Sequence, residues 1–427
     1  MDTPMHALVD GGLIHRDAYA DPEIFKLEHE MLFRRTWLYV GHESQFASPG
    51  DYYSTTLANE PILIVRGEDG QPRAFFNRCT HRGAVIARRP QGKARNLQCA
   101  YHGWSFKLDG SLNFTPLMQG YEGSDVQTHA DTFALKPVPR FASYRGFYFA
   151  SLAPEGQELE DFLGPVAVHL ANMVERSPTG EIEVWGGVFR MIKRNNWKVY
   201  LENLHDGAHA LSTHSSSIRA AQSIIESTTS EWTQLQAYII AANSQPPSAM
   251  AQIAVNCFGS GHSNMMAFRK TRPDNPGQRE YEDALAKRVG RDGVEEILGV
   301  DCHNAIIYPT LSLQPNWMQL RLIVPLDVNT TRVDVWTFQL KGAPDWINRR
   351  IQTYANTIHT PASLVRADDL ENFERVQIGL QARSVPWVSA HRGIANEGEP
   401  QGKSTAMSER YVRNQFDAWS KYMKGAL

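Results

Sequence analysis

The segment CTHRGAVIARRPQGKARNLQCAYHGW, residues 79–104, holds two of the four cysteines of this 427-residue chain, and each is followed closely by a histidine. One residue separates Cys79 from His81, and two residues separate Cys99 from His102. Thiolate and imidazole groups are ligands for soft and borderline metals. The segment therefore predicts a metal centre held by two short Cys/His pairs.

Two kinds of metal centre fit these four ligands. A structural zinc ion accepts two thiolates and two imidazoles in a tetrahedron. A [2Fe–2S] cluster with two cysteines on one iron and two histidines on the other takes one ligand from each pair for each iron. Gly83 and Gly103 permit tight turns after the pairs. Tyr101 and Trp104 offer the sulfur atoms an apolar cover, and these neighbours favour the cluster.

Length and composition limit the class of protein. A chain of 427 residues exceeds one ordinary core, so we expect two domains. The formal net charge of −3 does not favour nucleic acid or an anionic membrane as a partner. Apolar runs are too short to cross a bilayer and the N-terminus lacks the order of a secretion signal, so we expect a cytoplasmic protein. We expect the other two cysteines, Cys257 and Cys302, to be buried as small hydrophobic residues.

The pattern along the chain changes near residues 50 and 155. Residues 20–38 space apolar side chains at helical intervals after Asp21 and Pro22. From 50 to 151, short β-rich runs between turn residues predict a compact antiparallel unit. Beyond it we expect strands at 181–193, 316–327 and 331–341, helices at 195–209, 345–358 and 408–423, and an exposed charged loop at 273–299.

A second group of candidate ligands occurs in residues 197–214, WKVYLENLHDGAHALSTH. On the expected helix, Asn203, Asp206 and His209 share one face because they are three residues apart. His209 and His214 are five apart, a rotation of about 140° on a regular helix. Both can bind one metal only if the helix ends or bulges between them. Taken alone, such histidines are more often surface or core residues than metal ligands.

A carboxylate would complete a set of two histidines and one acid, which binds non-haem Fe(II) and leaves positions open for O₂ and water. Residues 364–380 offer Asp368, Asp369, Glu371 and Glu374 near the start of an expected helix. The alternative role for these acids is to complement the helix dipole.

Together the two groups of residues indicate a family. The first pattern resembles the Rieske motif, Cys-x-His…Cys-x-x-His-Gly. The second resembles the iron motif of Rieske non-haem oxygenases, Glu-Asn-x-x-Asp-x-x-His-x-x-x-x-His, and is matched at Glu202, Asn203, Asp206, His209 and His214. Over essentially its whole length the chain resembles the large (α) subunit of an aromatic-ring-hydroxylating oxygenase.

The resemblance implies an α+β fold. An N-terminal all-β Rieske domain precedes a helix-grip (START/Bet v1-like) catalytic domain, in which an antiparallel sheet curves around a helix. We expect an N-terminal helical segment packing on the catalytic domain at 1–45, the Rieske domain at 46–155 and the catalytic domain at 156–427.

The resemblance also implies roles for individual residues. The ligands of the [2Fe–2S] cluster correspond to Cys79, His81, Cys99 and His102. The ligands of the mononuclear Fe(II) correspond to His209, His214 and Asp369, with Asp368 as the alternative acid. Asp206 matches the carboxylate that bridges to a cluster histidine of a neighbouring subunit, and Asn203 is expected near the iron as a polar pocket group.

The activity implied is that of a terminal oxygenase. Electrons from NAD(P)H pass through a reductase, in some members with a ferredoxin, to the cluster and then to Fe(II), which uses O₂ to cis-dihydroxylate a small aromatic substrate. A small β subunit in an α3β3 assembly is expected, with α3 as the alternative. A Rieske monooxygenase, acting by single hydroxylation or O/N-demethylation, is the enzymatic alternative. The non-catalytic alternatives are a Rieske electron carrier and a zinc-stabilised binding protein.

The substrate class follows from a detail of the second motif. Its Asn-x-x-Asp spacing resembles members that act on benzoate, anthranilate and salicylate, which implies an aromatic acid. A carboxylate needs a positive or hydrogen-bonding partner in an otherwise apolar pocket. The candidates in the catalytic segments are Arg219, Arg269 and Arg321, and the sequence does not select among them.

Overall fold

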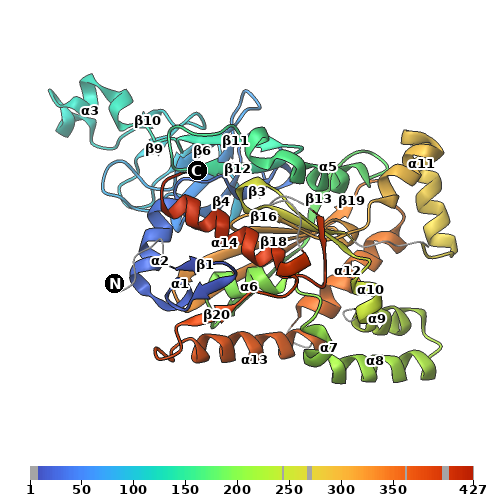
Figure 1. Ribbon diagram of the computed structural model, residues 1–427. Coiled ribbons are helices and arrows are strands. Elements are labelled where there is room, and N and C mark those ends of the chain that lie inside the picture. The colour runs from blue at the N-terminus through green and yellow to red at the C-terminus, as the bar shows by residue number, and fades with distance from the viewer. Residues whose placement is uncertain (1–7, 243–244, 267–271, 361–362, 397–402, 427) are drawn as a thin grey trace. The chain divides into compact units, whose positions relative to one another are not determined.

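The computed structural model describes residues 8–242, 245–266, 272–360, 363–396 and 403–426 (Figure 1). Contacts between residues divide the chain into two compact units. Residues 33–162 form the small unit, and residues 1–32 together with 163–427 form the large unit. Arg269, one of the three candidate arginines, lies outside the described residues.

The expected domain ranges, 1–45, 46–155 and 156–427, have edges inside the small unit. Strand β3 (Leu38–His42) pairs with β12 (Phe147–Ser151), so its contacts lie in the small unit. The three ranges stay a prediction about which segments fold as independent domains.

The small unit consists of short antiparallel strands, as the β-rich runs predicted. One sheet has the order β6-β5-β4-β7, with bounds Pro72–Phe76, Glu60–Arg66, Asp51–Leu57 and Gln91–Lys93. A second has the order β10-β9-β8, with bounds Leu112–Phe114, Ser105–Phe106 and Leu97–Gln98. The third joins β11 (Arg140–Tyr144) to β12 and β3. Helical segments here are short, such as α3 (Asp125–Thr128).

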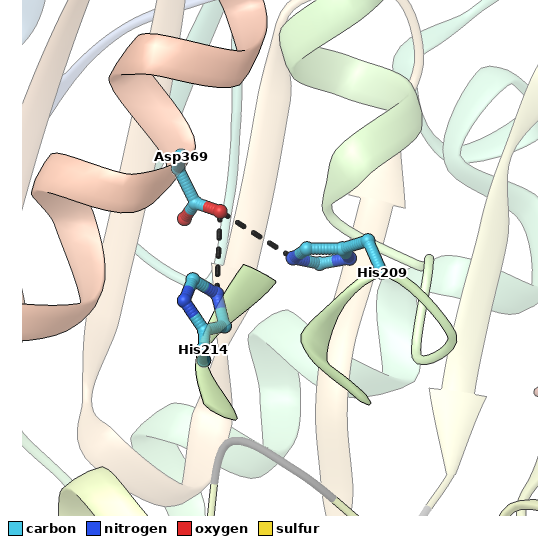
Figure 2. A group of neighbouring side chains, drawn as sticks. All are labelled: His209, His214 and Asp369. Carbon is cyan, nitrogen blue, oxygen red and sulfur yellow. Dashed lines mark ion pairs between the residues drawn. The ribbon is translucent and has the colours of Figure 1, made fainter. Parts of the chain in front are cut away.

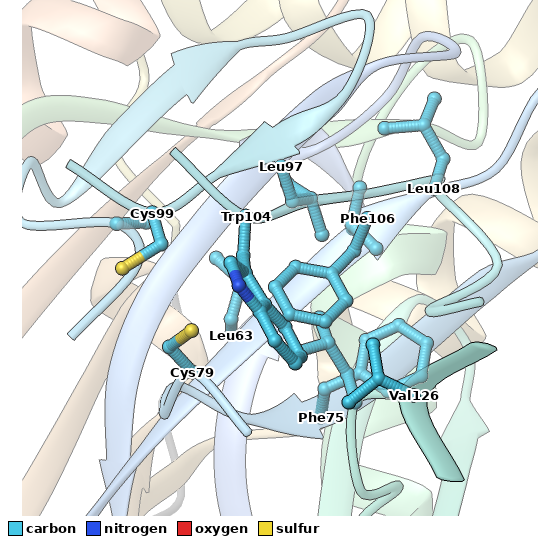
Figure 3. Packing of buried hydrophobic residues seen from close by; sticks show 12 residues of the cluster. Leu63, Phe75, Cys79, Leu97, Cys99, Trp104, Phe106, Leu108 and Val126 are labelled. Carbon is cyan, nitrogen blue, oxygen red and sulfur yellow. The ribbon is translucent and has the colours of Figure 1, made fainter. Parts of the chain in front are cut away.

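The core of the small unit gathers apolar side chains from several of these strands (Figure 3). Leu63 and Phe106 are fully buried, and Trp104 is 2% exposed. Cys79 and Cys99 belong to the same cluster and are buried as well. Because interiors are close-packed, this core holds the two cysteine-bearing loops in place.

The large unit contains an eight-stranded sheet whose neighbouring strands are all antiparallel. Its order is β13-β19-β18-β17-β16-β15-β14-β21. The bounds in that order are Ile182–Lys193, Thr330–Leu340, Gln319–Asp327, Leu311–Gln314, Cys302–Ile307, Ser263–Met266, Ala254–Cys257 and Lys403–Thr405. A separate small sheet has the order β1-β2-β20, with bounds Val9–Asp10, Leu13–His15 and Trp387–Ser389.

Several helices contact the large sheet. Helix α6 (Trp197–Asn203) contacts β18, α12 (Asp345–His359) contacts β19, α13 (Leu364–Gly379) contacts β13, and α14 (Arg410–Met423) contacts β14. Other helices of this unit are α1 (Asp17–Ala20), α2 (Pro22–Glu28), α5 (Ala167–Glu175), α7 (Ala210–Thr213), α8 (Ser215–Ser227), α9 (Glu231–Ala241), α10 (Pro247–Met250) and α11 (Pro276–Gly299). The predicted α+β, helix-grip fold is confirmed.

Helix α2 anchors α6 from the N-terminal segment. The carboxylate of Glu28 is fully buried and accepts hydrogen bonds from Trp197 Nε1 at 2.9 Å and Trp419 Nε1 at 2.7 Å. The ammonium group of Lys198 forms an ion pair with the same carboxylate. Since α6 leads directly into residues 203–214, this buried network fixes the approach of the chain to the second group of candidate ligands.

Two secondary-structure predictions were wrong. The helix expected at 195–209 begins after the capping residue Asn196 but ends at Asn203. The segment 273–299, expected to be a loop, forms α11, where the Asn275 side chain accepts from the backbone of Gln278. Few residues of α11 are buried, and most of the others are polar or charged, so the sequence shows no clear helical repeat of apolar residues.

The other long elements lie where the sequence predicted them. Strands β13, β18 and β19 and helices α12 and α14 fall in the expected ranges. Asp21 caps α2 by accepting from the backbone of Glu23 at 2.8 Å, and Pro22 occupies the first turn. Within the described ranges, no helix combines the length and apolar composition needed to cross a membrane.

Candidate metal centres

Two histidines and one aspartate converge in the large unit (Figure 2). The Oδ1 atom of Asp369 lies 3.4 Å from Nε2 of His209 and 3.2 Å from Nε2 of His214. One ligand atom from each residue lies within 4.8 Å of the other two. Two imidazoles and one carboxylate that converge in this way form the donor set that suits non-haem Fe(II).

Breaks in the helix bring the two histidines together. His209 stands at the N-terminal end of α7, after the turn that follows α6. His214 joins α7 to α8 with φ −99° and ψ 10°, outside the helical range. The condition set by the five-residue spacing, that the helix be interrupted between the histidines, is met by this conformation.

Asp369 and its neighbour Asp368 approach different atoms. Asp369 faces the Nε2 atoms of both histidines, whereas Oδ2 of Asp368 lies 3.4 Å from Nδ1 of His214. The same Oδ2 atom accepts from the Ser217 hydroxyl at 3.2 Å. A carboxylate on the far nitrogen of a histidine ligand orients the ring toward the metal. This geometry favours Asp369 as the ligand and Asp368 as the orienting group.

Electrostatic interactions couple the acid to the imidazoles. Burial raises the pKa of Asp369, but hydrogen bonds and charges from His209 and His214 outweigh it and hold the pKa below its ordinary value. Burial lowers the pKa of His209, but Asp369 and Asp206 together raise it by a larger amount, so the pKa lies above its ordinary value. A divalent cation would take over the role of these protons.

Asn203 and Asp206 also contact His209. Nδ2 of Asn203 lies 3.1 Å from Nε2 of His209, and the backbone oxygen of Asp206 lies 2.6 Å from Nδ1. The Asp206 carboxylate accepts from Arg392 Nη2 at 3.1 Å and from the backbone of Ala208 at 2.9 Å. The turn that follows α6 therefore brings these residues to His209 although they do not share a helix face.

The third histidine of this segment, His205, is a core residue. Its ring is fully buried, with Nε2 3.2 Å from the Asn304 carbonyl oxygen and Nδ1 3.2 Å from the Ser263 hydroxyl. Burial lowers the pKa of His205 to about 3, which keeps the ring neutral. It is not part of the group of three ligands.

A cavity of about 110 Å³ adjoins the three ligands. Most of its lining side chains are polar or charged, including Lys193, Asn203, Asp206, His303, Asn304, Gln314, Arg321, His359 and Arg366. Apolar contributions come from Leu204, Met265, Ile358 and Val365. Of the candidate arginines that the structure describes, Arg321 lines this cavity and Arg219 on α8 does not.

The two Cys/His pairs of the small unit lie on loops of equivalent conformation. The backbone N–H of Cys79 donates to Ala84 at 2.8 Å, and that of Cys99 donates to Trp104 at 2.8 Å. The N–H groups of Gly83 and Gly103 each donate to the preceding cysteine carbonyl at 3.0 Å. Both glycines have positive φ, +79° and +73°, which explains the residue type at these positions.

The side chains of the two loops face one another. Figure 3 shows the sulfur atoms of Cys79 and Cys99 beside the indole of Trp104. The rings of His81 and His102 are edge to face at 4.7 Å, and His81 stacks on Trp104 at 4.8 Å. The buried Nδ1 atom of His81 has no hydrogen-bond partner among the described residues. Trp104 supplies the apolar cover that was expected, whereas Tyr101 is 60% exposed.

Sequence reasoning missed several residues of the large unit. Nothing in the sequence connects Arg392 with Asp206, because they are far apart along the chain. Lys193 and Arg366 line the cavity from the end of a strand and the first turn of a helix, where a charged residue is unremarkable. A signal existed for Arg321, which alternates with apolar residues on a strand and so points to one face.

Two family models match the chain. The model of the Rieske [2Fe-2S] domain matches residues 36–134, and that of the ring hydroxylating alpha subunit (catalytic domain) matches residues 185–423. These ranges contain both groups of candidate ligands.

Individual proteins are similar over most of the chain. The toluate 1,2-dioxygenase subunit alpha of Pseudomonas putida is 32% identical over 86% of this chain and 78% of its own. The anthranilate 1,2-dioxygenase large subunit of Acinetobacter baylyi is 31% identical over 89% and 80%. A solved structure of naphthalene 1,2-dioxygenase with indole bound has a TM-score of 0.80, covers 98% of this chain and 94% of its own, and is 24% identical. The last likeness concerns the fold alone.

Proposed function

We propose a function on the premise that this chain belongs to the family of Rieske ring-hydroxylating oxygenase α subunits, which the two family models and the relatives establish. The chain is thus the large subunit of a ring-hydroxylating dioxygenase with a Rieske [2Fe–2S] cluster and a mononuclear iron. Electrons from NAD(P)H reach it through a reductase. The proposals concern its substrate, its individual site residues and its assembly.

Each metal centre has a proposed ligand set. We assign the cluster to Cys79, His81, Cys99 and His102. We assign the mononuclear Fe(II) to His209, His214 and Asp369, with Asp368 holding the His214 ring. The support is the convergence of the three iron ligands within 4.8 Å and the two equivalent loops that carry the cysteines.

The proposed substrate is a single-ring aromatic acid of the benzoate, anthranilate or salicylate type. Two relatives are named for toluate and anthranilate, and both are more than 30% identical to the chain. The cavity of about 110 Å³ compares with roughly 150 Å³ for an engineered cavity that holds benzene, so one ring suits it better than two. Its polar lining suits an ionised substrate better than a hydrocarbon.

In the proposed reaction, one ring, one O₂, two electrons and two protons combine in a cis-dihydrodiol that contains both oxygen atoms. The bound iron supplies the activation of O₂. The chain supplies the rest: Asp368 orients one histidine, Asn203 contacts the other, and the cavity wall holds the ring. This division leaves substrate orientation to residues that do not bind metal.

Asp206 has a proposed role in electron transfer between subunits. We propose that its carboxylate bridges to a cluster histidine of a neighbouring α subunit, in an α3β3 assembly with a small β subunit. Its side chain is 26% exposed and is held by Arg392, so part of the carboxylate remains accessible. A carboxylate hydrogen-bonded to a cluster histidine would couple proton position to the oxidation state of the cluster.

The convergence of two histidines and one aspartate beside a cavity lined by Arg321 carries this proposal. The test is to supply the purified oxygenase with a surrogate reductase, NADH and ¹⁸O₂ and to screen benzoate, anthranilate, salicylate and naphthalene. The expected product is a dihydrodiol with two ¹⁸O atoms from a single-ring acid. A product with one label, or turnover of naphthalene alone, would contradict it.

A further inference from the structure

Three buried cations face the cavity beside the iron ligands. They are Lys193 on β13, Arg321 on β18 and Arg366 on α13, with exposed fractions of 2%, 6% and 9%. Burying a charge without a counter-charge is costly, so such a group needs a partner in some state of the protein. The partners of each cation therefore indicate which of them is available to a ligand.

Arg366 already has neutral partners in the chain. Its Nε group donates to the Ile358 carbonyl oxygen at 2.9 Å, and its Nη2 group contacts Nδ1 of His359. His359 in turn contacts Gln319 through Nε2 at 2.7 Å. Arg366 is therefore tied to the helix and the sheet, and its contribution to the cavity is its positive charge.

Arg321 and Lys193 lack such partners. The Nη1 group of Arg321 makes one long contact, 3.4 Å, with Oδ1 of Asn304, and its buried Nε has no hydrogen-bond partner among the described residues. The Lys193 ammonium lies over the rings of Tyr200 and Phe373 at 4.5 and 4.8 Å. In the part of the chain that the structure describes, neither cation has a carboxylate within ion-pair distance.

Further polar atoms without a hydrogen-bond partner among the described residues belong to side chains on the same face of the sheet as Arg321. Ser312 on β17 stands opposite Arg321 in the antiparallel register, and Gln319 precedes Arg321 by two residues on β18. The Ser312 hydroxyl and the Gln319 Nε2 group are buried and have no partner among the described residues. Amide and guanidinium N–H groups can only donate, so the group that satisfies them must be an acceptor.

The acids that line the cavity are engaged elsewhere. Asp369 faces the two histidines of the iron site, and Asp206 accepts from Arg392. The mutual repulsion of the cations is visible at Lys193, whose pKa is held well below its usual value by burial and then by Arg366 and Arg321, against the opposing effect of Asp369. An anion in the cavity would relieve that repulsion.

We propose that Arg321 and Lys193, two cations on strands of the sheet, form the binding site for the carboxylate of the substrate. The iron ligand Asp369, which is negatively charged, lines the same cavity. The inference rests on the proposed function, in which the iron site acts on a single-ring aromatic acid, and names the residues that select that acid. The Arg321 guanidinium offers the planar pair of donors that matches a carboxylate. The Lys193 ammonium adds a point charge.

The site also sets the orientation of the ring. A carboxylate anchored to the sheet leaves the ring to extend through the rest of a cavity that the iron ligands also line. A neutral ring has no equivalent anchor and leaves the buried donors unsatisfied, which is costly in a low-dielectric site. Arg321 and Lys193 are thus specificity-determining residues that touch substrate without taking part in the chemistry.

The test measures binding of two probes, benzoate and its neutral analogue benzamide, to the metal-loaded oxygenase by isothermal titration. We expect R321M to raise the Kd of benzoate on the order of 100-fold and that of benzamide by less than about 3-fold. R321K, which keeps the charge but not the planar fork, is expected to lose roughly 10-fold for benzoate, and K193M about as much.

A matched control variant is R190M. Arg190 is on the same strand as Lys193 but pairs with Asp334 and is 54% exposed, outside the cavity lining. It should bind both probes as the wild type does. Iron and acid-labile sulfide contents are measured for every variant, and if R321M fails to load its metals, R321K and K193M decide the result.

The outcomes separate this inference from the proposed function. Equal losses for benzoate and benzamide in R321M, unchanged benzoate binding, or a wild type that binds both probes equally would overturn the anion site. Arg321-dependent binding of benzoate without dihydrodiol formation from any aromatic acid would contradict the proposed function and leave the anion site standing. If R321M dihydroxylates benzoate as well as the wild type does, the proposed function stands and the anion site is contradicted.

Discussion

The two metal centres of this protein are built in opposite ways. The four proposed cluster ligands lie within 26 consecutive residues, 79–104, on two loops with the same backbone hydrogen bonds. The proposed iron ligands come from the two ends of α7 and from Asp369, far along the chain on α13. The first centre depends on local turns, and the second depends on the packing of separate elements against one sheet. Substitutions should therefore be able to damage one centre and spare the other.

The greatest damage is expected where a centre loses a ligand. C79S should abolish the cluster while the iron site still takes up iron, because its ligands lie in the other unit. Absorption and EPR spectra of the cluster, acid-labile sulfide and total iron test this. Loss of both centres in C79S would mean that the large unit depends on the cluster for its fold.

The reciprocal variant is D369N, which keeps the shape of the side chain and removes its charge. We expect the mononuclear iron and dihydroxylation to be lost and the cluster spectrum to remain. Single-turnover assays with chemically reduced cluster and O₂ measure the loss. A D369N protein that retains iron and turnover would move the ligand role to another acid.

A substitution outside both ligand sets should affect the iron site first. In E28A, the buried Lys198 ammonium loses its counter-charge, which costs about 3–5 kcal/mol of unfolding free energy. Burial already lowers the pKa of Lys198, and Glu28 opposes that effect. Urea denaturation followed by tryptophan fluorescence gives the cost, and cluster absorbance in the same titration serves as the internal control. Equal sensitivity of both signals would remove the contrast between the centres.

A smaller effect is expected at the acid beside the ligand. D368N removes the carboxylate that contacts Nδ1 of His214 but leaves Asp369 in place. We expect iron affinity or turnover to fall by roughly 10–100-fold, the usual range for such orienting groups. Iron titration of apo-protein compares D368N with D369N. A complete loss of iron in D368N, with D369N still active, would exchange the two assignments.

The mildest change separates the two equivalent cluster loops. A Cβ at Gly103 would lie 3.0 Å from the Pro116 ring, whereas one at Gly83 would lie 3.2 Å from the flexible Arg78 side chain. Both positions have positive φ, so each alanine variant costs about 1–2 kcal/mol from the backbone alone. We expect G103A to lose the cluster at a lower temperature than G83A. Thermal scans of cluster absorbance give the temperature at which each variant loses its cluster. Identical midpoints would show that the Pro116 ring moves aside at no cost.

Much of the fold could be predicted because local patterns agreed with the final packing. The long strands β18 and β19 and the amphipathic helices α12 and α14 carry their burial pattern in consecutive residues. Segment 276–299 was missed because only scattered positions such as Tyr281, Leu285 and Val294 are buried in α11. The end of α6 at Asn203 was missed because the residues that follow are stabilised by contacts outside the helix.

By itself, the sequence predicted two metal centres, the residue types that would hold them and the family that the chain resembles, because the Cys-x-His, Cys-x-x-His and spaced-histidine motifs are local patterns. Tertiary structure decided the rest. It set Asp369 rather than Asp368 against both imidazoles, placed Arg321 rather than Arg219 in the cavity and joined Arg392 to Asp206. The physical reason is that ligand spacing within a turn is fixed by backbone dihedrals. Contacts between distant elements depend on which faces of a helix and a sheet become buried together.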